Sequence, residues 1–560
     1  MKGKVVWDRH AVYAGLKTVG ECRPLLLTEL RDMLNRYHGT GHSVRYWDVL
    51  AGMWLEQFMH VCYAAWMEAC ASDTDTDVSA LSVPVLDHLV TPLEFSNRVA
   101  GGEDLVDNLV TAMKRFVLCA RPIARLSKNE SGIIKGEVRP GGIRHAVRMV
   151  LFRFVFSRTP RVVICAPYFQ CSQREWMTVL WKWRDWACMD GFEEAPVVPF
   201  EYDNEWRNNE SERKDDLSGF AGALSFLLPL CVPAVFLEGY ERFRAEALAL
   251  REHRPAIAYT ANALHYNMLF KLCAAEWSER GTVLLSHQHG GGYGLDRIHA
   301  IEDFETRVTD RFYSWGWSRD DRQVKPMSIG VYRPRVKRNH RQILLNCIDF
   351  PKAVYRLHFH PMPGTMETMI SETIDFLEAF PDHNDFLIRP YATDYGWGLV
   401  QRIMAAAPRA RYDHGSKHRN IYMSYAESGL VVHNYLGTSW LQTLGLNIPT
   451  ICFYDRETYE FRDEARPYIE RLESVGILHR TGRAAAAFIR DRQGNVGDWW
   501  MNDAVQEARG AFCSRYTRYS DHWAEDWEKE FKEILAASGD GAKPVGTDKS
   551  NERSTIRRMI

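Results

Sequence analysis

The chain has 560 residues, of which 46% are apolar and 25% charged, as in an average soluble globular protein. This composition excludes collagen-like, coiled-coil and wholly disordered chains, and the length exceeds what one hydrophobic core usually supports, so we expect two domains. The 70 lysines and arginines nearly balance the 72 acidic residues, giving a net charge of −2, so there is no global electrostatic footprint for nucleic acid.

Residues 1–150 are predicted to be mainly helical and to belong to the acceptor side of the first domain. Leu25 to Leu34 is amphipathic, and Tyr46 to Met67 is apolar nearly all round, which is typical of a buried helix. Buried polar groups need partners, and this segment contains Glu56 and His60. They indicate either a satisfied core network or the wall of a cleft, and the sequence leaves both open.

From about Arg161, short β-branched and aliphatic runs alternate with helical stretches. Such runs are typical of parallel strands that helices cover on both faces, so residues 151–335 are predicted to form a Rossmann-like α/β domain. The expected strands are Val162–Cys165, Val197–Phe200, Ala256–Tyr259 and Val283–Ser286, and the expected helices include Trp176–Met189 and Arg242–Arg251. The apolar stretch Phe220 to Leu237 is expected to form a buried helix, a turn and a strand.

A polar, proline-bearing linker from Lys325 to His340 precedes a second strand-helix series, residues 336–535, which we expect to bind the nucleotide donor. Its predicted strands are 342–347, 385–389, 429–433 and 450–453, and its predicted helices are 366–379, 399–407 and 440–444. A helical end, 502–535, is expected to close the fold and cross back to the first domain. Residues 536–560 are small, polar and charged, which predicts a disordered tail.

The chain contains no window of about 18 uninterrupted apolar residues, so we predict no transmembrane helix. Its N-terminal apolar run is too short for a signal peptide, so we expect it to remain in the cytosol. Two α/β domains imply a cleft in which ligands bind at the carboxyl ends of the strands.

The loop Ser286 to Gly294 follows a predicted strand and contains two histidines among glycines. Glycine lets a backbone approach a phosphate or sugar closely, and His289 can accept a proton near neutral pH. The candidate donor-binding residues of this loop are Gln288, Gly290, Gly291 and Gly292. The spacing differs from a dinucleotide fingerprint, and no capped helix follows.

A second polar loop follows the predicted strand 429–433. Its candidate phosphate-binding residues are His433, Gly437, Thr438 and Ser439. The start of the next helix can bind a diphosphate through free amides and the helix dipole, although a simple capped helix start stays an alternative. Arg389 ends another predicted strand, where it can hold a phosphate bidentately or form a surface salt bridge.

The sequence predicts no metal site and no cofactor. Asp73 to Asp77 lacks the glycine and terminal glutamate of a calcium loop, and it does not follow a strand as a metal-binding Asp-x-Asp should. The 20 histidines show no zinc-ligand spacing. P-loop, His-Glu-x-x-His and Gly-x-Ser-x-Gly motifs do not occur.

The combination of motifs resembles a family of bacterial surface-carbohydrate transferases found among lipopolysaccharide and nonulosonic-acid genes. The motifs are His42-Ser-Val-Arg-Tyr-Trp47, Trp54-Leu-Glu-Gln-Phe58, Gln288-His-Gly-Gly-Gly-Tyr-Gly294, Trp315-Gly-Trp317, Leu436-Gly-Thr-Ser-Trp440 and Asn447-Ile-Pro-Thr450. At longer range the layout is similar to CDP-glycerol glycerophosphotransferases and bacterial Kdo transferases. These resemblances imply an α/β, GT-B-like fold in which two Rossmann-like domains face each other across a cleft, with a helical N-terminal region.

The implied function is that of a metal-independent glycosyltransferase. The donor would be a nucleotide sugar, with a CMP-linked acidic sugar preferred, and the acceptor a surface glycan, lipid-linked glycan or glycoprotein. His289 matches the histidine of the His-Gly loop and is expected to be the base, with Glu56 or His60 as alternatives. Arg389 and Thr438–Ser439 match the phosphate-contacting loops. Such an enzyme would work in the cytoplasm, where lipid-linked acceptors would bring it to the inner face of the membrane.

Three other functions stay open at this stage. A CDP-polyol phosphotransferase would share the layout, and the glycine-rich version of the His289 loop leaves the donor undecided. A non-hydrolysing nucleotide-sugar epimerase of the same fold would need no acceptor. A non-catalytic glycan-binding or assembly subunit would need no base.

Overall fold

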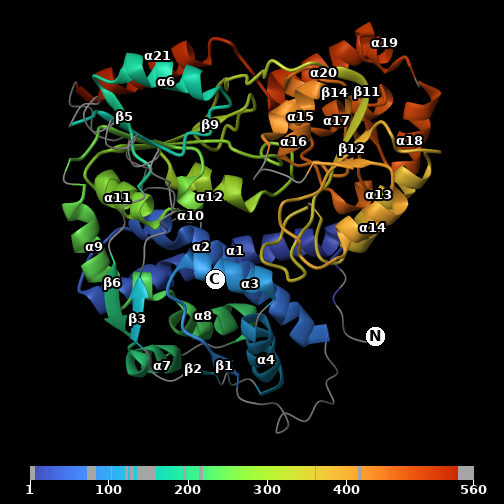
Figure 1. The fold of residues 1–560 in the computed structure, drawn as a ribbon. Helices are drawn as coiled ribbons and strands as arrows, with labels where there is room; N and C mark the ends of the chain where they lie inside the picture. The colour runs from blue at the N-terminus through green and yellow to red at the C-terminus, as the bar shows by residue number, and fades with distance from the viewer. Residues whose placement is uncertain are drawn as a thin grey trace.

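The computed structural model describes residues 5, 7–71, 84–102, 104–119, 124–126, 131–134, 159–192, 197–213, 218–251, 253–359, 361–413, 419–492 and 494–539. A helical N-terminal region lies beneath two α/β domains (Figure 1). The predicted domain boundary near residue 150 lies outside the described residues, and the one near residue 335 stays a prediction.

Six parallel strands form the sheet of the first α/β domain, in the order β10-β9-β8-β7-β4-β5. They are β4 Val162–Cys165, β5 Ala187–Met189, β7 Ile257–Thr260, β8 Val283–His287, β9 Arg311–Ser314 and β10 Val324–Pro326. Because β5 and β7 flank β4, the strand order reverses between β4 and β7. The loops that leave the carboxyl ends of these two strands diverge, which is where ligands bind in such sheets.

The second sheet is also six-stranded and parallel, in the order β13-β12-β11-β14-β15-β16. Its strands are β11 Asn339–Asn346, β12 Phe386–Arg389, β13 Arg411–Tyr412, β14 Ser428–His433, β15 Thr450–Phe453 and β16 Leu478–His479. The order reverses between β11 and β14, so this sheet has the strand order 3-2-1-4-5-6 of a Rossmann fold. The predicted α/β, GT-B-like architecture with two Rossmann-like domains is therefore present.

Helices cover both sheets. The helices between β4 and β11 are α6 Gln173–Trp183, α7 Asn204–Glu212, α8 Gly219–Cys231, η2 Ala234–Phe236, α9 Tyr240–Ala249, α10 Ala263–Tyr266, α11 Met268–Glu279 and α12 Ala300–Val308. Of these, α8 packs on the N-terminal helices and α7 packs on α8, so neither covers the sheet. Those that follow are α13 Met366–Glu378, α14 Leu399–Ala406, α15 Ile421–Glu427, α16 Thr438–Gly445, η3 Arg456–Thr458, α17 Arg466–Ser474, α18 Gly482–Asp491, α19 Val496–Trp500, α20 Asp503–Tyr516 and α21 Trp523–Gly539. None of the helices in the described part of the chain is both long and apolar enough to cross a bilayer.

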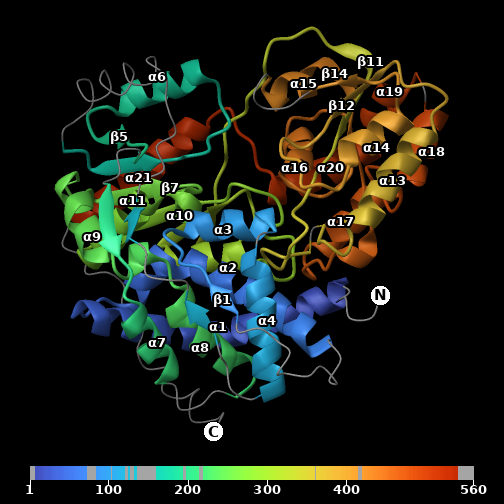
Figure 2. The same ribbon diagram turned by 60° about the horizontal axis from the view of Figure 1, so that its bottom comes forward.

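The N-terminal region is built on two long helices, α1 Arg9–His38 and α2 Val44–Ala71, together with α3 Pro92–Gly101 and α4 Asp104–Cys119 (Figure 2). Asp8 caps α1, because its Oδ1 accepts from the amide of Ala11 at 2.8 Å, and Gly39 ends it in the left-handed conformation. The apolar α2 lies buried between α1, α4 and α11, as its composition predicts.

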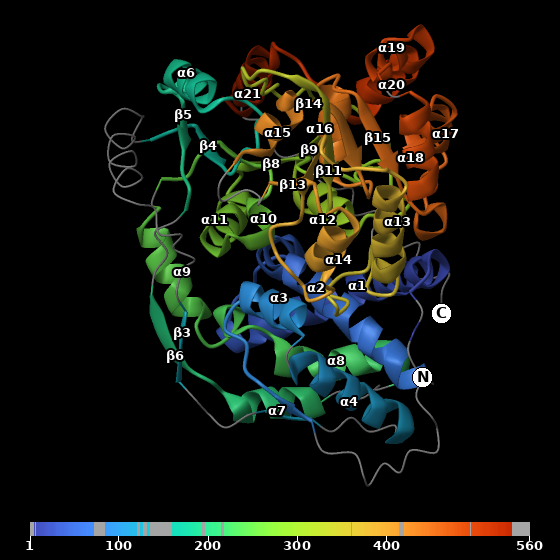
Figure 3. The ribbon, with the colours of Figure 1, turned by 45° about the vertical axis from the view of Figure 1, so that its right-hand side comes forward.

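The last helix, α21, packs on the first sheet although it follows the second one in the chain (Figure 3). Trp527 and Phe531 lie against Tyr259, and the carboxylate of Glu530 accepts from Tyr313 Oη at 2.7 Å. The expected return to the first domain is thus confirmed. The helix continues through residues 536–539, which the sequence assigned to a disordered tail, and residues 540–560 lie outside the described residues.

Three local predictions are wrong. The run around Val198 forms β6 (Val198–Glu201), which pairs antiparallel with β3 (Ser131–Ile134) instead of joining the parallel sheet, and its alternating burial is typical of such a ribbon. The helix predicted to reach Met189 ends at Trp183, and β5 follows. The predicted strand before Leu237 is a short 3₁₀ helix. The remaining two short strands, β1 Val85–Leu86 and β2 Arg125–Leu126, pair with each other.

Candidate functional site

The turn after β8 and the turn after β14 are in direct contact, although they belong to different domains. The amide of Gly291 donates to Thr438 Oγ1 at 3.1 Å. A Cβ atom on Gly291 would lie 2.6 Å from the carbonyl carbon and oxygen of Gly437, so only glycine permits this approach. The two turns that the sequence singled out therefore face each other.

Helix α16 begins at this contact without a side-chain cap. Its N-cap residue is Gly437, and within the described part of the chain no side-chain hydrogen bond caps it. The hydroxyl of Thr438 instead receives the Gly291 amide. Free amides at a helix N-terminus carry partial positive charge and bind anions, so this end of α16 suits a phosphate.

A pocket of about 360 Å³ lies beside the start of α16, between the two domains. Its walls are Tyr168, Phe169, Gln170 and Cys171 from the loop after β4, Tyr332 from the linker, and Asn420, Ile421, Tyr422, Thr438, Ser439 and Gln442 from the second domain. Gln170 Oε1 accepts from Tyr422 Oη at 2.5 Å and from Tyr519 Oη at 2.6 Å, which joins the first domain to the second at the pocket wall.

The loop after β4 reaches the pocket through strained backbone. Ala166 and Tyr168 adopt the left-handed conformation, with φ of 45° and 52°, which costs a residue with a side chain free energy. This conformation places the Tyr168 ring at the pocket wall and also 6.4 Å, centroid to centroid, from the ring of His289. The pocket and the imidazole are thus neighbours.

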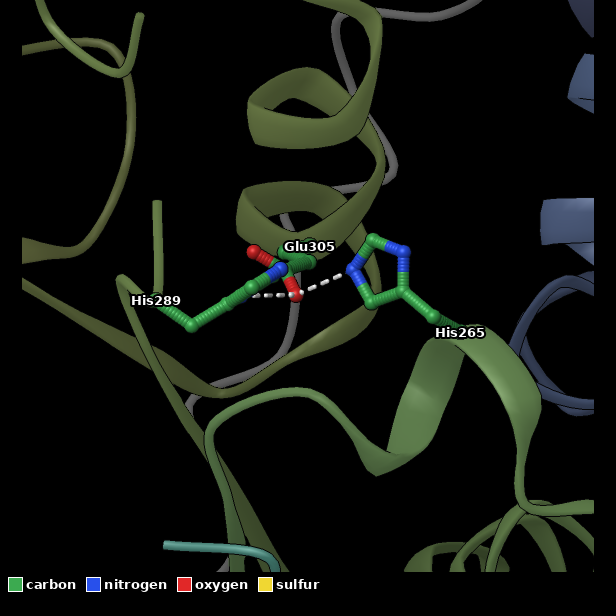
Figure 4. A group of neighbouring side chains, drawn as sticks. All are labelled: His265, His289 and Glu305. Atoms are coloured by element: carbon green, nitrogen blue, oxygen red, sulfur yellow. Dashed lines mark hydrogen bonds and ion pairs between the residues drawn. The ribbon is translucent and has the colours of Figure 1, made fainter. Parts of the chain in front are cut away.

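His289 belongs to a cluster that joins three elements of the first domain (Figure 4). His265 on α10 contacts Glu305 on α12 through Nε2 and Oε1 at 2.9 Å, and Tyr293 Oη donates to Glu305 Oε2 at 2.9 Å. His289 Nδ1 lies 3.7 Å from Glu305 Oε1 and 3.4 Å from Tyr293 Oη. The side chains of both histidines are 18% exposed, whereas Glu305 is fully buried beneath them.

Burial favours the neutral form of each titratable group in this cluster. It lowers the pKa of His289 to about 4 and that of His265 to about 3, and it raises the pKa of Glu305 to about 7. Neutral imidazoles are proton acceptors at neutral pH. One ligand atom each from His265, His289 and Glu305 lies within 4.8 Å of the others, so the three could also hold a metal ion.

Gln288 does not reach the pocket. It is fully buried, its Oε1 accepts from Trp315 N and from Trp317 Nε1 at 2.9 Å each, and its Nε2 donates to Gly290 O at 2.9 Å. Both polar atoms of its side-chain amide are therefore hydrogen-bonded within the protein. The predicted donor contact is therefore absent, and Gln288 instead braces the glycine turn against the Trp-Gly-Trp segment.

Arg389 and His433 are likewise buried away from the pocket. Arg389 Nη1 bonds Asp413 Oδ2 at 2.6 Å and its Nη2 donates to Arg419 O at 3.1 Å. His433 contacts Thr443 Oγ1 through Nε2 at 3.1 Å, and burial lowers its pKa to about 3, so it is a neutral core residue. The geometry does not support the phosphate contacts expected of these two residues.

Glu56 and His60, the alternative bases, lie in a buried network of α1 and α2. Arg23 Nε bonds Glu56 Oε2 at 2.6 Å, and a second carboxylate, Asp48, accepts from Arg23 Nη2 at 2.6 Å. His60 Nδ1 accepts from the amide of Leu357 at 3.1 Å. Burial has the largest single effect and would raise the pKa of Glu56, but Arg23, His60 and Arg307 together outweigh it and hold that pKa at about 2, which suits an ion-pair partner and not a base.

The sequence analysis missed His265 and Glu305 of the cluster, and it missed Arg356, whose charge acts on both imidazoles. His265 follows β7 just as His289 follows β8, so the strand-end criterion could have found it. Glu305 lies inside an ordinary amphipathic helix and carries no local signal. Arg356 lies in the loop after β11, where its Nε is buried with no hydrogen-bond partner among the described residues.

Comparison with known proteins gives one family and several distant structures. The sequence model of the LIC12162 family transferases matches residues 4–531, and no curated protein matches the chain. The chain is similar to a structure of S. aureus MnaA with UDP (8% identity, TM-score 0.37, covering 67% of this chain and 96% of that one). It is also similar to MurG of Acinetobacter baumannii (9%, 0.33, 67% and 100%) and to a glycosyltransferase of Rickettsia africae (9%, 0.34, 68% and 99%). Because these TM-scores are low, the evidence for the architecture is the strand order of the two sheets.

The contact between the two turns predicts opposite outcomes for adjacent glycines. Gly291→Ala places a methyl group 2.6 Å from the Gly437 carbonyl and should cost about 1–3 kcal/mol of stability by overpacking. Urea unfolding of the variant and of the wild type measures this loss. Gly290→Ala is the matched control, because its Cβ would lie 3.5 Å from Thr438 Oγ1 in ordinary contact. Equal behaviour of the two variants would contradict the assigned contact.

The buried carboxylate of Glu56 predicts a pH-dependent stability. Its pKa is about 2 in the folded chain and about 4.3 in an unfolded one, so its contribution is present above pH 5 and is lost as the pH falls toward 2. Glu56→Gln should lose about 3 kcal/mol at pH 7, and the difference from wild type should shrink in acid. Urea unfolding at pH 7, 5, 4 and 3 measures this. A constant difference across that range would disprove the ion pair.

Proposed function

Because the chain belongs to the LIC12162 family transferases, we propose that it is a metal-independent glycosyltransferase of the GT-B type. It would move a sugar from a nucleotide-sugar donor to a bacterial surface glycan, lipid-linked glycan or glycoprotein. One observation carries the proposal: the Gly291–Thr438 contact brings the turn of His289 beside the uncapped start of α16, at the edge of the interdomain pocket. A proton acceptor would thereby lie next to the hollow that the anion site lines, with the Tyr168 ring between the pocket and His289.

The pocket would hold the nucleotide. Tyr168, Tyr332 and Tyr422 supply aromatic faces on which a base can stack, and a volume of about 360 Å³ lies within the range of small-molecule sites. The amides of Thr438 and Ser439 would bind the phosphate next to the sugar. These amides and the helix dipole would do what a divalent cation does in other glycosyltransferases, which is why we propose a metal-independent reaction.

Arg356 replaces Arg389 as the proposed phosphate-binding arginine. Its buried Nε has no hydrogen-bond partner among the described residues, and its positive charge helps to lower the pKa values of His265 and His289, on which burial has the larger effect. An arginine whose buried Nε is free of hydrogen bonds to the described residues suits a phosphate or carboxylate oxygen. Arg389 is already neutralised by Asp413.

In the proposed reaction, His289 takes the proton of the acceptor hydroxyl as the acceptor oxygen bonds the anomeric carbon. The departing phosphate is stabilised by the start of α16 and by Arg356. A CMP-linked acidic sugar stays the preferred donor, because Arg356 could also bind its carboxylate. We place the enzyme in the cytoplasm, where lipid-linked acceptors would draw it to the inner membrane face, and propose no nucleic-acid partner.

The two arginines give a matched test of the phosphate site. Arg356→Gln should weaken binding of the tightest of CMP, CDP, UDP and GDP by about tenfold or more, since hydrogen bonds to charged groups contribute about 1.5–3 kcal/mol, and it should leave the melting temperature unchanged. Arg389→Gln should instead lose about 3–5 kcal/mol of stability, because it leaves Asp413 buried without its cation. Thermal shift followed by calorimetry measures both. Unaltered affinity in Arg356→Gln would remove Arg356 from the site.

Product analysis separates the proposal from its nearest alternative. The uncapped start of α16 would accept a CDP-polyol as well as a nucleotide sugar, so a polyol-phosphate transfer uses the same pocket. We expect the product of wild-type protein to contain the donor sugar and no additional phosphorus. His289→Ala should abolish product formation while nucleotide affinity persists. New phosphorus in the product would establish the alternative, and turnover without an acceptor would indicate an epimerase.

A further inference from the structure

A buried carboxylate joins the two imidazoles at the edge of the proposed site (Figure 4). Glu305 accepts one hydrogen bond on each oxygen: Oε1 from His265 Nε2 at 2.9 Å and Oε2 from Tyr293 Oη at 2.9 Å. A carboxylate held on both oxygens by groups from two other elements has a fixed orientation. His265 and Tyr293 therefore fix the orientation of the Glu305 carboxylate, which faces the proposed base, His289.

The contact between Glu305 and His289 is incomplete while the imidazole is neutral. Glu305 Oε1 and His289 Nδ1 are 3.7 Å apart, beyond hydrogen-bond distance but within the range of an ion pair. When His289 gains a proton, the attraction between opposite charges in this buried setting draws the two groups together. An interaction that strengthens as the proton arrives stabilises the transition state more than the ground state.

We propose that Glu305 is a positioning residue for His289, with His265 and Tyr293 fixing its carboxylate. This inference rests on the proposed transferase function. In the step, the proton of the acceptor hydroxyl passes to His289 and the acceptor oxygen bonds the anomeric carbon. The bond from that carbon to the phosphate oxygen breaks, and its electron pair leaves with the phosphate. The Glu305 carboxylate balances the imidazolium until the proton passes to water.

The surrounding charges make Glu305 the partner that the imidazolium needs. Burial has the largest effect and lowers the pKa of His289; His265 and Arg356 lower it further, whereas Glu305 opposes them. On neighbouring elements, Glu302 adds to the effect of burial in raising the pKa of Glu305, and Lys271 adds to its effect in lowering that of His265. His287 also interacts with His289 as a like charge, and the backbone of Ala261 supports the protonated imidazole. Glu305 is the side chain whose charge favours the protonated form of His289.

A metal ion is the competing occupant of this cluster. His265, His289 and Glu305 present ligand atoms within 4.8 Å of one another, and zinc would draw them to bonds of about 2.0–2.2 Å. A nitrogen that ligates a metal carries no proton, so a metal ion would exclude a hydrogen bond from His265 Nε2 to Glu305. Metal analysis is therefore part of the test.

The central variant is Glu305→Gln, which keeps the size of the side chain and removes its charge. With donors built on the nucleotide that binds tightest, kcat should fall on the order of 100-fold, the scale of general-base catalysis, while calorimetric affinity for that nucleotide stays within about twofold. Glu305→Asp should recover part of the rate because it restores the charge. The matched control is Asp303→Asn on the same helix, whose carboxylate bonds Arg319 at 2.9 Å and should keep the wild-type rate.

A second measurement needs no substrate. Exchange of the imidazole C2 hydrogen, followed by mass spectrometry, reports the pKa of each histidine, and Glu305→Gln should lower that of His289 because the imidazolium loses its counter-charge. The exposed His340 and His522 are internal references that should not change. An unchanged His289 pKa, an unchanged kcat, or one zinc per chain whose removal abolishes activity would overturn the inference. Failure of the wild type to bind any of CMP, CDP, UDP and GDP would remove the transferase proposal instead, and the exchange measurement would still decide the role of Glu305.

Discussion

The meeting of the two turns at the pocket depends on one close backbone approach. Gly291 and Gly437 come so near that a single Cβ atom would collide, and the Gly291 amide closes the gap by donating to Thr438. The N-cap residue of α16 is Gly437, which has no side chain, so the helix begins without a side-chain cap. The same contact sets the edge of the interdomain pocket. The proximity of an imidazole, an anion site and a hollow thus follows from the steric requirement of two glycines.

Burial distinguishes two kinds of polar residue in this chain: those that are fully buried in ion pairs and support the fold, and those that stay partly exposed and can react. Arg389 and Glu56 are buried with opposite charges, so their charges are already balanced and they hold the scaffold. His265 and His289 contact a buried carboxylate, which orients them, and their side chains remain 18% exposed, which leaves them accessible to a substrate. A proton acceptor needs both conditions, orientation and access. This division explains how a chain with many charged motifs has one compact candidate site.

Much of the fold was predictable from local patterns. The continuous apolar runs of β4, β7 and β15 indicate buried parallel strands, and all three are strands with every residue buried. The alternating β6 was misread, because a strand run does not reveal its partner. The two turns were found because they follow strands, and ligands bind at strand ends. Gln288 and His433 passed the same criterion and are buried in the core, since the strand-end position does not tell which way a side chain points.

The sequence by itself determined the class of architecture, the two glycine-bearing turns and the histidine at the first of them. Periodicity and strand-end position are local properties, so a linear reading captures them. Only the tertiary structure decided that His265, Tyr293 and Glu305 surround His289 and that Asp413 neutralises Arg389. It also decided that Arg356 Nε is buried without a hydrogen bond to any described residue. Those outcomes depend on which side chains from distant segments meet, and on what burial does to their charges. Neither the contacts between distant side chains nor the effect of burial on their charges can be predicted from the spacing of residues along a chain.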